Sequence, residues 1–270
     1  TLTRSDGTTL YTTRDIAYSL WKFEKVERVV NVIGAEQTLA QLHLKIALCA
    51  LGYKAFASNQ RHFAYGLVEL PGYKMSSRRG RFITFDDVID EAVRRAEAEV
   101  SKRTPDLPED QRKQIANTIA ISAVKYALLS VEPTRNVIFV WDKVLNFETN
   151  SAPFINYAYT RAVGILRKLG DLPPEIDYQL ISDTLGRRLI FEISRFPQIF
   201  CEAADNLRPD DMANYCNMLA EKFHEYYEKA DVIHVEDKAL RYARGALIRA
   251  IKIVLRNGMA ILGMDLSERM

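Results

Sequence analysis

The sequence predicts an α/β region in the first third of the chain, followed by an all-α helical bundle. Three observations lead to this fold class. A β-branched run at residues 28–33 is ended by Gly34 and followed by a helical pattern. A second strand-like segment occupies residues 62–70, and from about residue 85 onward the apolar spacing is helical nearly throughout. Strand, helix and strand in this order predict parallel pairing through a right-handed crossover, as in nucleotide-binding α/β sheets.

The helix between the two strands is predicted from apolar spacing over residues 36–51. Gly52 follows the last periodic residue, which is the position where a glycine commonly caps a helix. The spacing places four side chains on one face of this helix: Leu39, Leu42, Ile46 and Cys49.

Proline and glycine positions predict the helices of the second region. One helix opens at residues 106–108 and runs to about 130. The others are predicted at 153–169, 174–184, 189–206 with a kink or break at Pro197, 209–228, and 238–256, where Gly258 stops the last one. Charge and prolines cluster at residues 101–114, a composition suited to an exposed connection. We therefore predict two domains, 1–108 and 109–270.

Composition bounds the class of protein. The chain has 270 residues and 48% hydrophobic residues, enough for two ordinary cores. Lys plus Arg number 37 against 35 for Asp plus Glu, so net charge alone does not indicate a polyanionic partner. No apolar run reaches the length of a membrane span. The first residue, Thr1, is not an initiator Met, and we expect the chain to be a fragment of a longer protein.

Cysteine and histidine spacing argues against a bound metal. The three cysteines are far apart in the sequence and form no CxxC pair, which fits a reducing compartment and neither a disulfide framework nor a thiolate zinc site. The four histidines lack the spacing of metal ligands. We expect them to be surface or packing residues: His43, His62, His224 and His234.

The loop at residues 74–81, KMSSRRGR, contains several basic and hydroxyl-bearing side chains. Four of its side chains are basic, and two serines and a glycine lie among them. Cationic side chains and backbone amides of this kind can close around a phosphate chain. Judged on composition alone, such a loop is most often a solvated surface loop.

Several segments resemble one family in order and spacing. Lys74-Met75-Ser76-Ser77-Arg78 follows the KMSKS loop of class I aminoacyl-tRNA synthetases. The other matching segments resemble arginyl-tRNA synthetases: residues 5–18 (SDGTTLYTTRDIAY), 32–37 (VIGAEQ), 66–68 (GLV), 152–161 (APFINYAYTR) and the C-terminal residues 257–270. The resemblance covers nearly the whole chain. It implies the second half of a Rossmann-type catalytic domain, followed by an anticodon-binding domain of the DALR type.

The resemblance also implies site residues. Those expected at the catalytic loop are Lys74, Ser76 and Ser77, and those expected to bind ATP are Gly66, Val68, Lys74 and Met75. Those expected to bind arginine are Tyr11, Asp15 and Gln37. Those expected to bind tRNA are Phe154, Tyr157, Arg161, Tyr227, Arg269 and Met270.

Elementary chemistry agrees with two of these sets. Tyr11 and Asp15 are four residues apart, so on a helix both lie on one face, where a carboxylate beside a phenol can accept the forked donors of a guanidinium. A helix cap or a salt bridge to Arg14 is the alternative role for Asp15. Phe154, Tyr157 and Arg161 form a helical stripe that can stack unpaired bases and hold a phosphate, although aromatic stripes more often belong to a core.

The implied function is ATP-dependent attachment of arginine to its tRNA through an arginyl adenylate. ATP is then a substrate, with Mg²⁺ expected and no metal held by the protein. The partners are arginine, ATP and the arginine tRNA. A cytoplasmic monomer without membrane association is expected.

The sequence departs from the family pattern at three points. Ser77 replaces the second lysine of the KMSKS loop, Ala40 stands where the family usually has a histidine, and no HIGH-like segment occurs. The chain would therefore supply one half of a nucleotide site. The alternative function is a non-catalytic tRNA-binding module or one subunit of a split synthetase. A cysteinyl-tRNA synthetase is disfavoured because clustered Cys and His zinc ligands are lacking.

Overall fold

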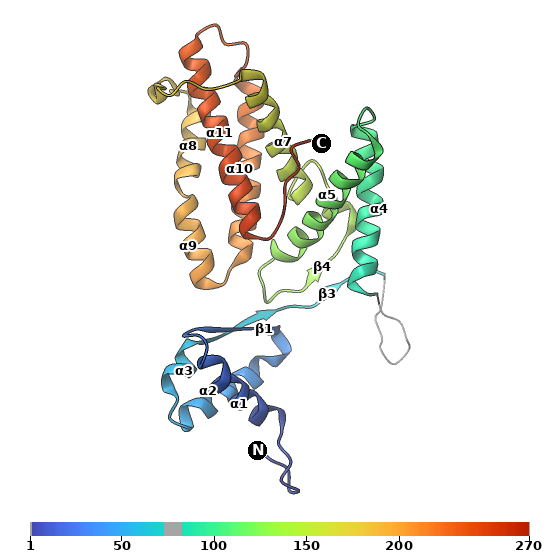
Figure 1. Ribbon diagram of the computed structural model, residues 1–270, viewed down its shortest axis with the longest axis vertical. Helices are drawn as coiled ribbons and strands as arrows, with labels where there is room; N and C mark the ends of the chain where they lie inside the picture. Colours follow the sequence, from blue (N-terminus) through green and yellow to red (C-terminus); the bar gives the residue numbers. More distant parts are fainter. Residues whose placement is uncertain (1, 73–82, 270) are drawn as a thin grey trace. The chain divides into compact units, whose positions relative to one another are not determined.

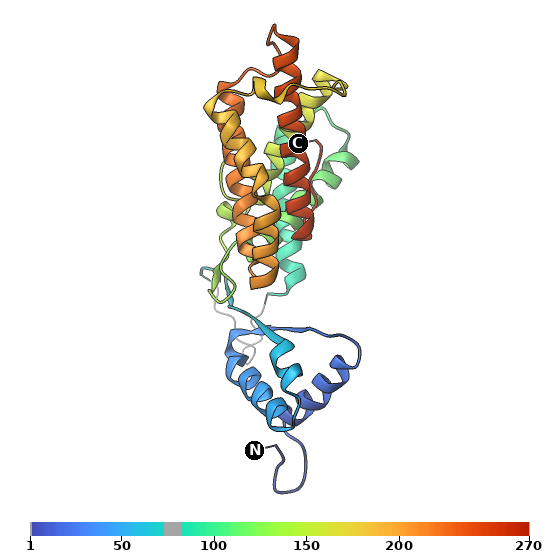
Figure 2. The same cartoon turned by 90° about the vertical axis from the view of Figure 1, so that its left-hand side faces the viewer.

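The computed structural model describes residues 2–72 and 83–269, which divide into two compact units (Figures 1 and 2). Unit 1 comprises residues 2–68 and Pro133–Val137, and unit 2 comprises the described residues of 69–132 and 138–269. The predicted order of fold classes, an α/β region followed by helices, is confirmed. The predicted boundary at residue 108 stays a prediction.

Unit 1 is built around a pair of parallel strands. Its elements in order are α1 (Tyr11–Phe23), β1 (Val29–Gly34), η1 (Ala35–Gln37), α2 (Thr38–Ala50), α3 (Lys54–Asn59) and β2 (Gln60–Tyr65). Strand β1 pairs with β2 in parallel, from Val29 opposite Gln60 to Gly34 opposite Tyr65, which confirms the predicted strand–helix–strand arrangement. A small core lies beneath the strands and contains Ile16, Leu44, Leu48 and Ala57.

The buried face of helix α2 is not the face that carries the predicted apolar stripe. The residues turned inward are Gln41, Leu44 and Leu48. The predicted stripe does lie on one face, but in the described residues that face is exposed: Leu39 (62%), Leu42, Ile46 and Cys49. An apolar helix face of this kind usually contacts another element.

The second predicted strand is shorter than its apolar run. β2 ends at Tyr65, and a separate short strand, β3 (Val68–Glu69), pairs with β4 (Val137–Ile138). The interruption has a physical cause at Gly66. Its backbone N–H donates to the Pro133 carbonyl at 2.7 Å, which takes the chain out of the first ladder.

Unit 2 begins with a helical hairpin. Helix α4 (Phe85–Arg103) opens with a capping box in which Thr84 and Asp87 exchange hydrogen bonds, and it packs on α5 (Glu109–Leu129). Small side chains on both helices are fully buried, among them Ala92, Ala96 and Ala116, and they allow close approach. Helix α6 (Trp141–Val144) closes this core.

The remaining helices form the predicted bundle. They are α7 (Ala152–Leu169), α8 (Thr184–Ser194), α9 (Phe196–Asn206), α10 (Pro209–Lys229) and α11 (Lys238–Ile261), with the 3₁₀ turn η3 (Tyr178–Leu180) between α7 and α8. Helix α10 contacts all the others of this set and carries the largest buried side chains, Phe223 and Tyr226. Figures 1 and 2 show α10 and α11 running alongside one another in unit 2.

Two helix predictions in the bundle are wrong. The helix expected over residues 174–184 is absent apart from η3, and α8 begins instead at Thr184, where the Asp183 carboxylate caps it by accepting from the Gly186 N–H at 2.7 Å. The last helix passes through Gly258 and ends at Ile261. Gly258 is therefore not a stop signal. A Cβ atom there would clash with Sγ of Cys216 on α10, so the glycine permits close helix packing.

Candidate functional site

The two predicted arginine-binding residues of α1 lie one helical turn apart, Tyr11 exposed and Asp15 half-buried. Tyr11 is the first residue of the helix and is 80% exposed, and Asp15 follows one turn later. The neighbouring Arg14 donates from Nε to Thr9 Oγ1 at 3.5 Å, and within the described part of the chain it forms no ion pair with Asp15. An ion pair between Asp15 and Arg14 is therefore not seen, and Asp15 is a half-buried residue whose charge acts on Lys22. Gln37 ends η1 and forms no hydrogen bond to either residue among those described.

A network of buried and half-buried polar side chains connects α1 to its neighbouring elements. Lys22 Nζ donates to Asn31 Oδ1 at 2.8 Å, and Asn31 Nδ2 donates to Gln41 Oε1 at 2.8 Å. Burial lowers the pKa of Lys22, and the charge of Asp15 opposes that shift. The network ties α1 to β1 and α2. The sequence offered one signal for it, because Asn31 interrupts an otherwise β-branched run.

The predicted ATP-binding glycine occupies a tight position in the backbone. A Cβ atom on Gly66 would clash with the Arg135 carbonyl, so no larger residue fits without a backbone shift. Val68 begins β3 and is 40% exposed. The other predicted residues of this set and of the catalytic loop lie outside the described residues: Lys74, Met75, Ser76 and Ser77.

In unit 2, α7 and α10 bring predicted tRNA-binding residues together. The Arg161 guanidinium lies 4.6 Å from the ring centroid of Tyr157 and 4.3 Å from that of Tyr227. It also donates to the Tyr157 hydroxyl at 2.5 Å. An arginine held between two aromatic rings combines a stacking surface with a positive charge. We call Tyr157, Arg161, His224 and Tyr227 the Arg161 cluster.

His224 is the member of this cluster that the sequence did not single out. Its ring stacks on Tyr157 with centroids 5.5 Å apart, and its Nδ1 lies 3.5 Å from a guanidinium nitrogen of Arg161. Burial and the charge of Arg161 lower the pKa of His224 to about 4. The ring is therefore neutral at pH 7 and can lie beside a cation. The prediction that His224 is a surface or packing residue agrees with its ring contacts, but it did not place His224 beside Arg161.

The remaining predicted tRNA-binding residues are placed differently. Phe154 is 8% exposed and belongs to the bundle core, where its ring lies 4.9 Å from that of His224. The first turn of α7 is buried in the bundle, and Ser151 caps the helix by accepting from the Phe154 N–H. Arg269 lies on the C-terminal tail, residues 263–269, and donates to Gln111 Oε1 at 3.3 Å. Met270 lies outside the described residues.

Neither a metal site nor a membrane segment is seen in the described ranges. Across residues 2–72 and 83–269, no group of three or more His, Cys, Asp or Glu side chains is placed to hold a metal ion. In the same ranges no helix has both the length and the apolar character to span a bilayer.

Known proteins resemble both parts of the chain. Residues 1–141 match the family described as tRNA synthetases class I (R), catalytic domain, and residues 155–270 match the DALR anticodon binding domain. A protein named arginine–tRNA ligase from Ignicoccus hospitalis is 46% identical over 272 residues, which cover all of this chain and 43% of the relative. One from Aeropyrum pernix is 41% identical over 276 residues and is covered to 42%.

A solved structure resembles the fold closely. The arginyl-tRNA synthetase of Thermus thermophilus superposes with a TM-score of 0.92 at 29% identity, over all of this chain and 50% of that one. The chain thus spans less than half the length of the two relatives named above. Since a family model matches more than half of its residues, the chain belongs to the arginine-specific class I tRNA synthetases.

Proposed function

We propose that the full-length polypeptide containing this chain attaches arginine to its tRNA at the expense of ATP. The observation that supports the proposal is the half-buried Asp15 carboxylate one turn after the exposed Tyr11 on α1. A carboxylate accepts the two parallel N–H donors of a guanidinium better than any other side chain does. Gln37 follows β1 on a neighbouring element and is the third residue that we assign to the arginine pocket.

The reaction has two displacement steps. The arginine carboxylate attacks the α-phosphate of ATP, which forms arginyl adenylate and releases pyrophosphate. The 2′-hydroxyl of the terminal adenosine of tRNA then attacks the adenylate carbonyl and releases AMP. No side-chain nucleophile is required, so catalysis depends on position and charge. Lys74, with Ser76, Ser77 and Met75, would stabilise the departing pyrophosphate, and ATP would enter as its Mg²⁺ complex. Gly66 and Val68 would face the adenine.

The tRNA would be held by the Arg161 cluster. Tyr227 is 38% exposed, and Arg161 next to it presents a cation, so an unpaired anticodon base can stack there while the adjoining phosphate is neutralised. Arg269 and Met270 at the chain end are further contacts in this proposal, and Phe154 supports the cluster from the core. We place the enzyme in the cytoplasm as a monomer.

Replacing Lys74 of the KMSKS-like loop tests the proposed reaction. In the full-length polypeptide, Lys74→Ala should reduce arginylation of tRNA by about a hundredfold or more, because one transition-state contact is worth roughly 3 kcal/mol. Tyr11→Phe should cause a smaller loss, since it removes only one hydroxyl from the proposed arginine pocket. An unchanged rate for Lys74→Ala would remove the loop from the mechanism. If the wild-type polypeptide binds tRNA but attaches no arginine, the chain is a non-catalytic tRNA-binding module or part of a split enzyme.

A further inference from the structure

The polar network of unit 1 joins three elements through three side chains, Lys22, Asn31 and Gln41. Lys22 lies in the last turn of α1, Asn31 is the third residue of β1, and Gln41 lies in the first turn of α2. Both hydrogen bonds through Asn31 are 2.8 Å long. Asn31 is 8% exposed and Gln41 is 6% exposed, so little water reaches either amide. We call these three side chains the Asn31 network.

The partners of Asn31 fix the orientation of its amide. An ammonium group can only donate, so Oδ1 of Asn31 faces Lys22 and Nδ2 faces Gln41, which in turn presents Oε1. Each contact in the network therefore has one possible direction. A buried polar network of this kind holds its elements in one arrangement, whereas apolar contacts are non-directional and permit small shifts.

The helices that the Asn31 network joins also carry residues of the proposed arginine pocket. Asp15 precedes Lys22 by two turns on the same face of α1. Gln37 ends η1, which continues directly into α2, and precedes Gln41 by one turn. Each pocket residue thus lies on the N-terminal side of the network residue that follows it. One amide on β1 ties both segments to the same strand.

Asp15 and Gln37 have little other support for their positions. Across residues 2–72 and 83–269, neither side chain is held by a hydrogen bond to another side chain. The distance between them therefore depends on how α1 and α2 are placed. A misplacement of about 1 Å in a binding group can cost a hundredfold in rate, so a small shift of either helix is measurable.

We propose that Asn31, together with Lys22 and Gln41, is a positioning residue of the arginine site. Its amide holds α1 and α2 at the separation that lets Asp15 and Gln37 contact one arginine molecule. The proposal rests on the proposed function, because it assumes that these two residues bind arginine.

Removing the Asn31 amide in the full-length polypeptide tests the proposal. Asn31→Leu deletes both hydrogen bonds with little change in volume. The value of kcat/KM for arginine should fall about tenfold, mainly through KM, while KM for tRNA should stay within about twofold of the wild-type value. KM reports on the folded molecules alone, so partial unfolding does not imitate this result.

Asn31→Asp is the conservative variant. One carboxylate oxygen can accept from Lys22, and the other can accept from the NH₂ group of Gln41 once that amide turns over. The value of kcat/KM for arginine should therefore stay within about threefold of the wild-type value. A loss as large as that of Asn31→Leu would contradict a role for these hydrogen bonds.

A triple variant separates positioning from stability. Asn31→Leu alone leaves Lys22 and the Gln41 carbonyl without their partners, which destabilises unit 1. The combination of Lys22→Met, Asn31→Leu and Gln41→Leu removes the unpaired groups, and urea unfolding should show a return toward wild-type stability. The rise in KM for arginine should remain, because apolar contacts do not restore the direction of the lost hydrogen bonds. Wild-type arginine kinetics in the triple variant would overturn the proposal.

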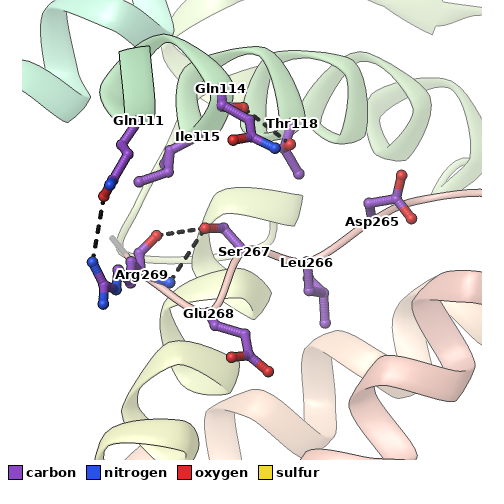
Figure 3. A pocket seen from close by; sticks show the side chains of 9 residues that line it. All are labelled: Gln111, Gln114, Ile115, Thr118, Asp265, Leu266, Ser267, Glu268 and Arg269. Atoms are coloured by element: carbon purple, nitrogen blue, oxygen red, sulfur yellow. Dashed lines mark hydrogen bonds between the residues drawn. The ribbon is translucent and has the colours of Figure 1, made fainter. Parts of the chain in front are cut away.

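Asn156→Leu is the matched control in unit 2. Asn156 is also buried, and its Oδ1 accepts from the Ser267 N–H at 2.6 Å on the C-terminal tail, which Figure 3 shows beside α5. The variant should leave kcat/KM for arginine within about twofold of the wild-type value, because it deletes a buried amide outside the arginine site. Equal losses in Asn156→Leu and Asn31→Leu would mean that any deleted buried amide has this effect, and the proposal would be wrong.

Asp15→Asn distinguishes the positioning role from the function on which it rests. If Asp15→Asn lowers kcat/KM for arginine and Asn31→Leu does not, the positioning role is wrong and the arginine pocket stands. If neither variant changes kcat/KM for arginine, the arginine site of the proposed function fails as well.

Discussion

At the scale of single residues, the Arg161 cluster shows how a protein keeps a cation between aromatic rings. The guanidinium lies against Tyr157 and Tyr227, and the space next to it is filled by His224 rather than by a charged or a small side chain. A neutral imidazole contacts the guanidinium without repulsion and continues the stack. A protonated one would place two positive charges side by side.

The low pKa of His224 predicts a pH dependence of stability. The folded pKa is about 4 and the unfolded value is near 6.5, so the unfolded chain takes up the proton first as the pH falls. The stability that His224 contributes is complete above pH 6.5 and is lost between pH 6.5 and pH 4. In His224→Phe, the free energy of unfolding should fall less between pH 7 and pH 5 than it does in the wild type.

Urea unfolding of the full-length polypeptide at pH 7, 6 and 5 measures this difference. His234→Phe is the control, because His234 is exposed in the loop before α11 and its pair with Asp231 is solvent-screened. Equal slopes for wild type and His224→Phe would show that His224 is not held neutral by its surroundings.

At the scale of elements, helices α10 and α11 depend on a contact that only glycine permits. A Cβ atom at Gly258 would overlap with Cys216 Sγ, and Cys216 is fully buried. Burial also raises the pKa of the Cys216 thiol to about 12, so it stays protonated. The pair therefore acts as a small apolar contact between two helices.

Gly258→Ala should destabilise unit 2 by about 1–3 kcal/mol, the usual cost of overpacking. Cys216→Ala on the same background removes the clashing sulfur and should restore part of that loss, even though glycine-to-alanine changes normally favour a helix. Urea unfolding of the two single variants and the double variant checks the coupling. Additive losses would mean that the two positions do not meet.

The elements also show what sequence patterns can and cannot predict. The parallel pair β1 and β2 and the start of α5 directly after Pro108 followed from local signals. The helix end predicted at Gly258 was wrong. A glycine can either end a helix or let two helices pack closely, and which of the two applies depends on the packing partner, here Cys216 on α10. The apolar stripe of α2 correctly predicted which residues share a helix face, but it did not predict that this face is exposed in the described residues. The candidate site followed mainly from motifs, whereas the position of His224 beside Arg161 depends on a contact between distant segments.

At the scale of the whole molecule, the chain combines two units with different tasks in the proposed reaction. In our proposal, Tyr11, Asp15 and Gln37 of unit 1 bind arginine and the Arg161 cluster of unit 2 binds tRNA. The formal net charge is only +2, so RNA affinity must depend on local groups rather than on a general positive field. Substitutions in one unit should therefore change the kinetic parameters for one substrate and leave those for the other substrate nearly unchanged.

The most direct measurement is the arginylation rate of the full-length polypeptide with Asp15→Asn, over a range of arginine and tRNA concentrations. Because an uncharged amide cannot pair with the guanidinium as a carboxylate does, kcat/KM for arginine should fall about a hundredfold, while KM for tRNA should stay within about twofold of the wild-type value. Wild-type kcat/KM for arginine in Asp15→Asn, or a wild-type polypeptide that attaches no arginine, would contradict the account.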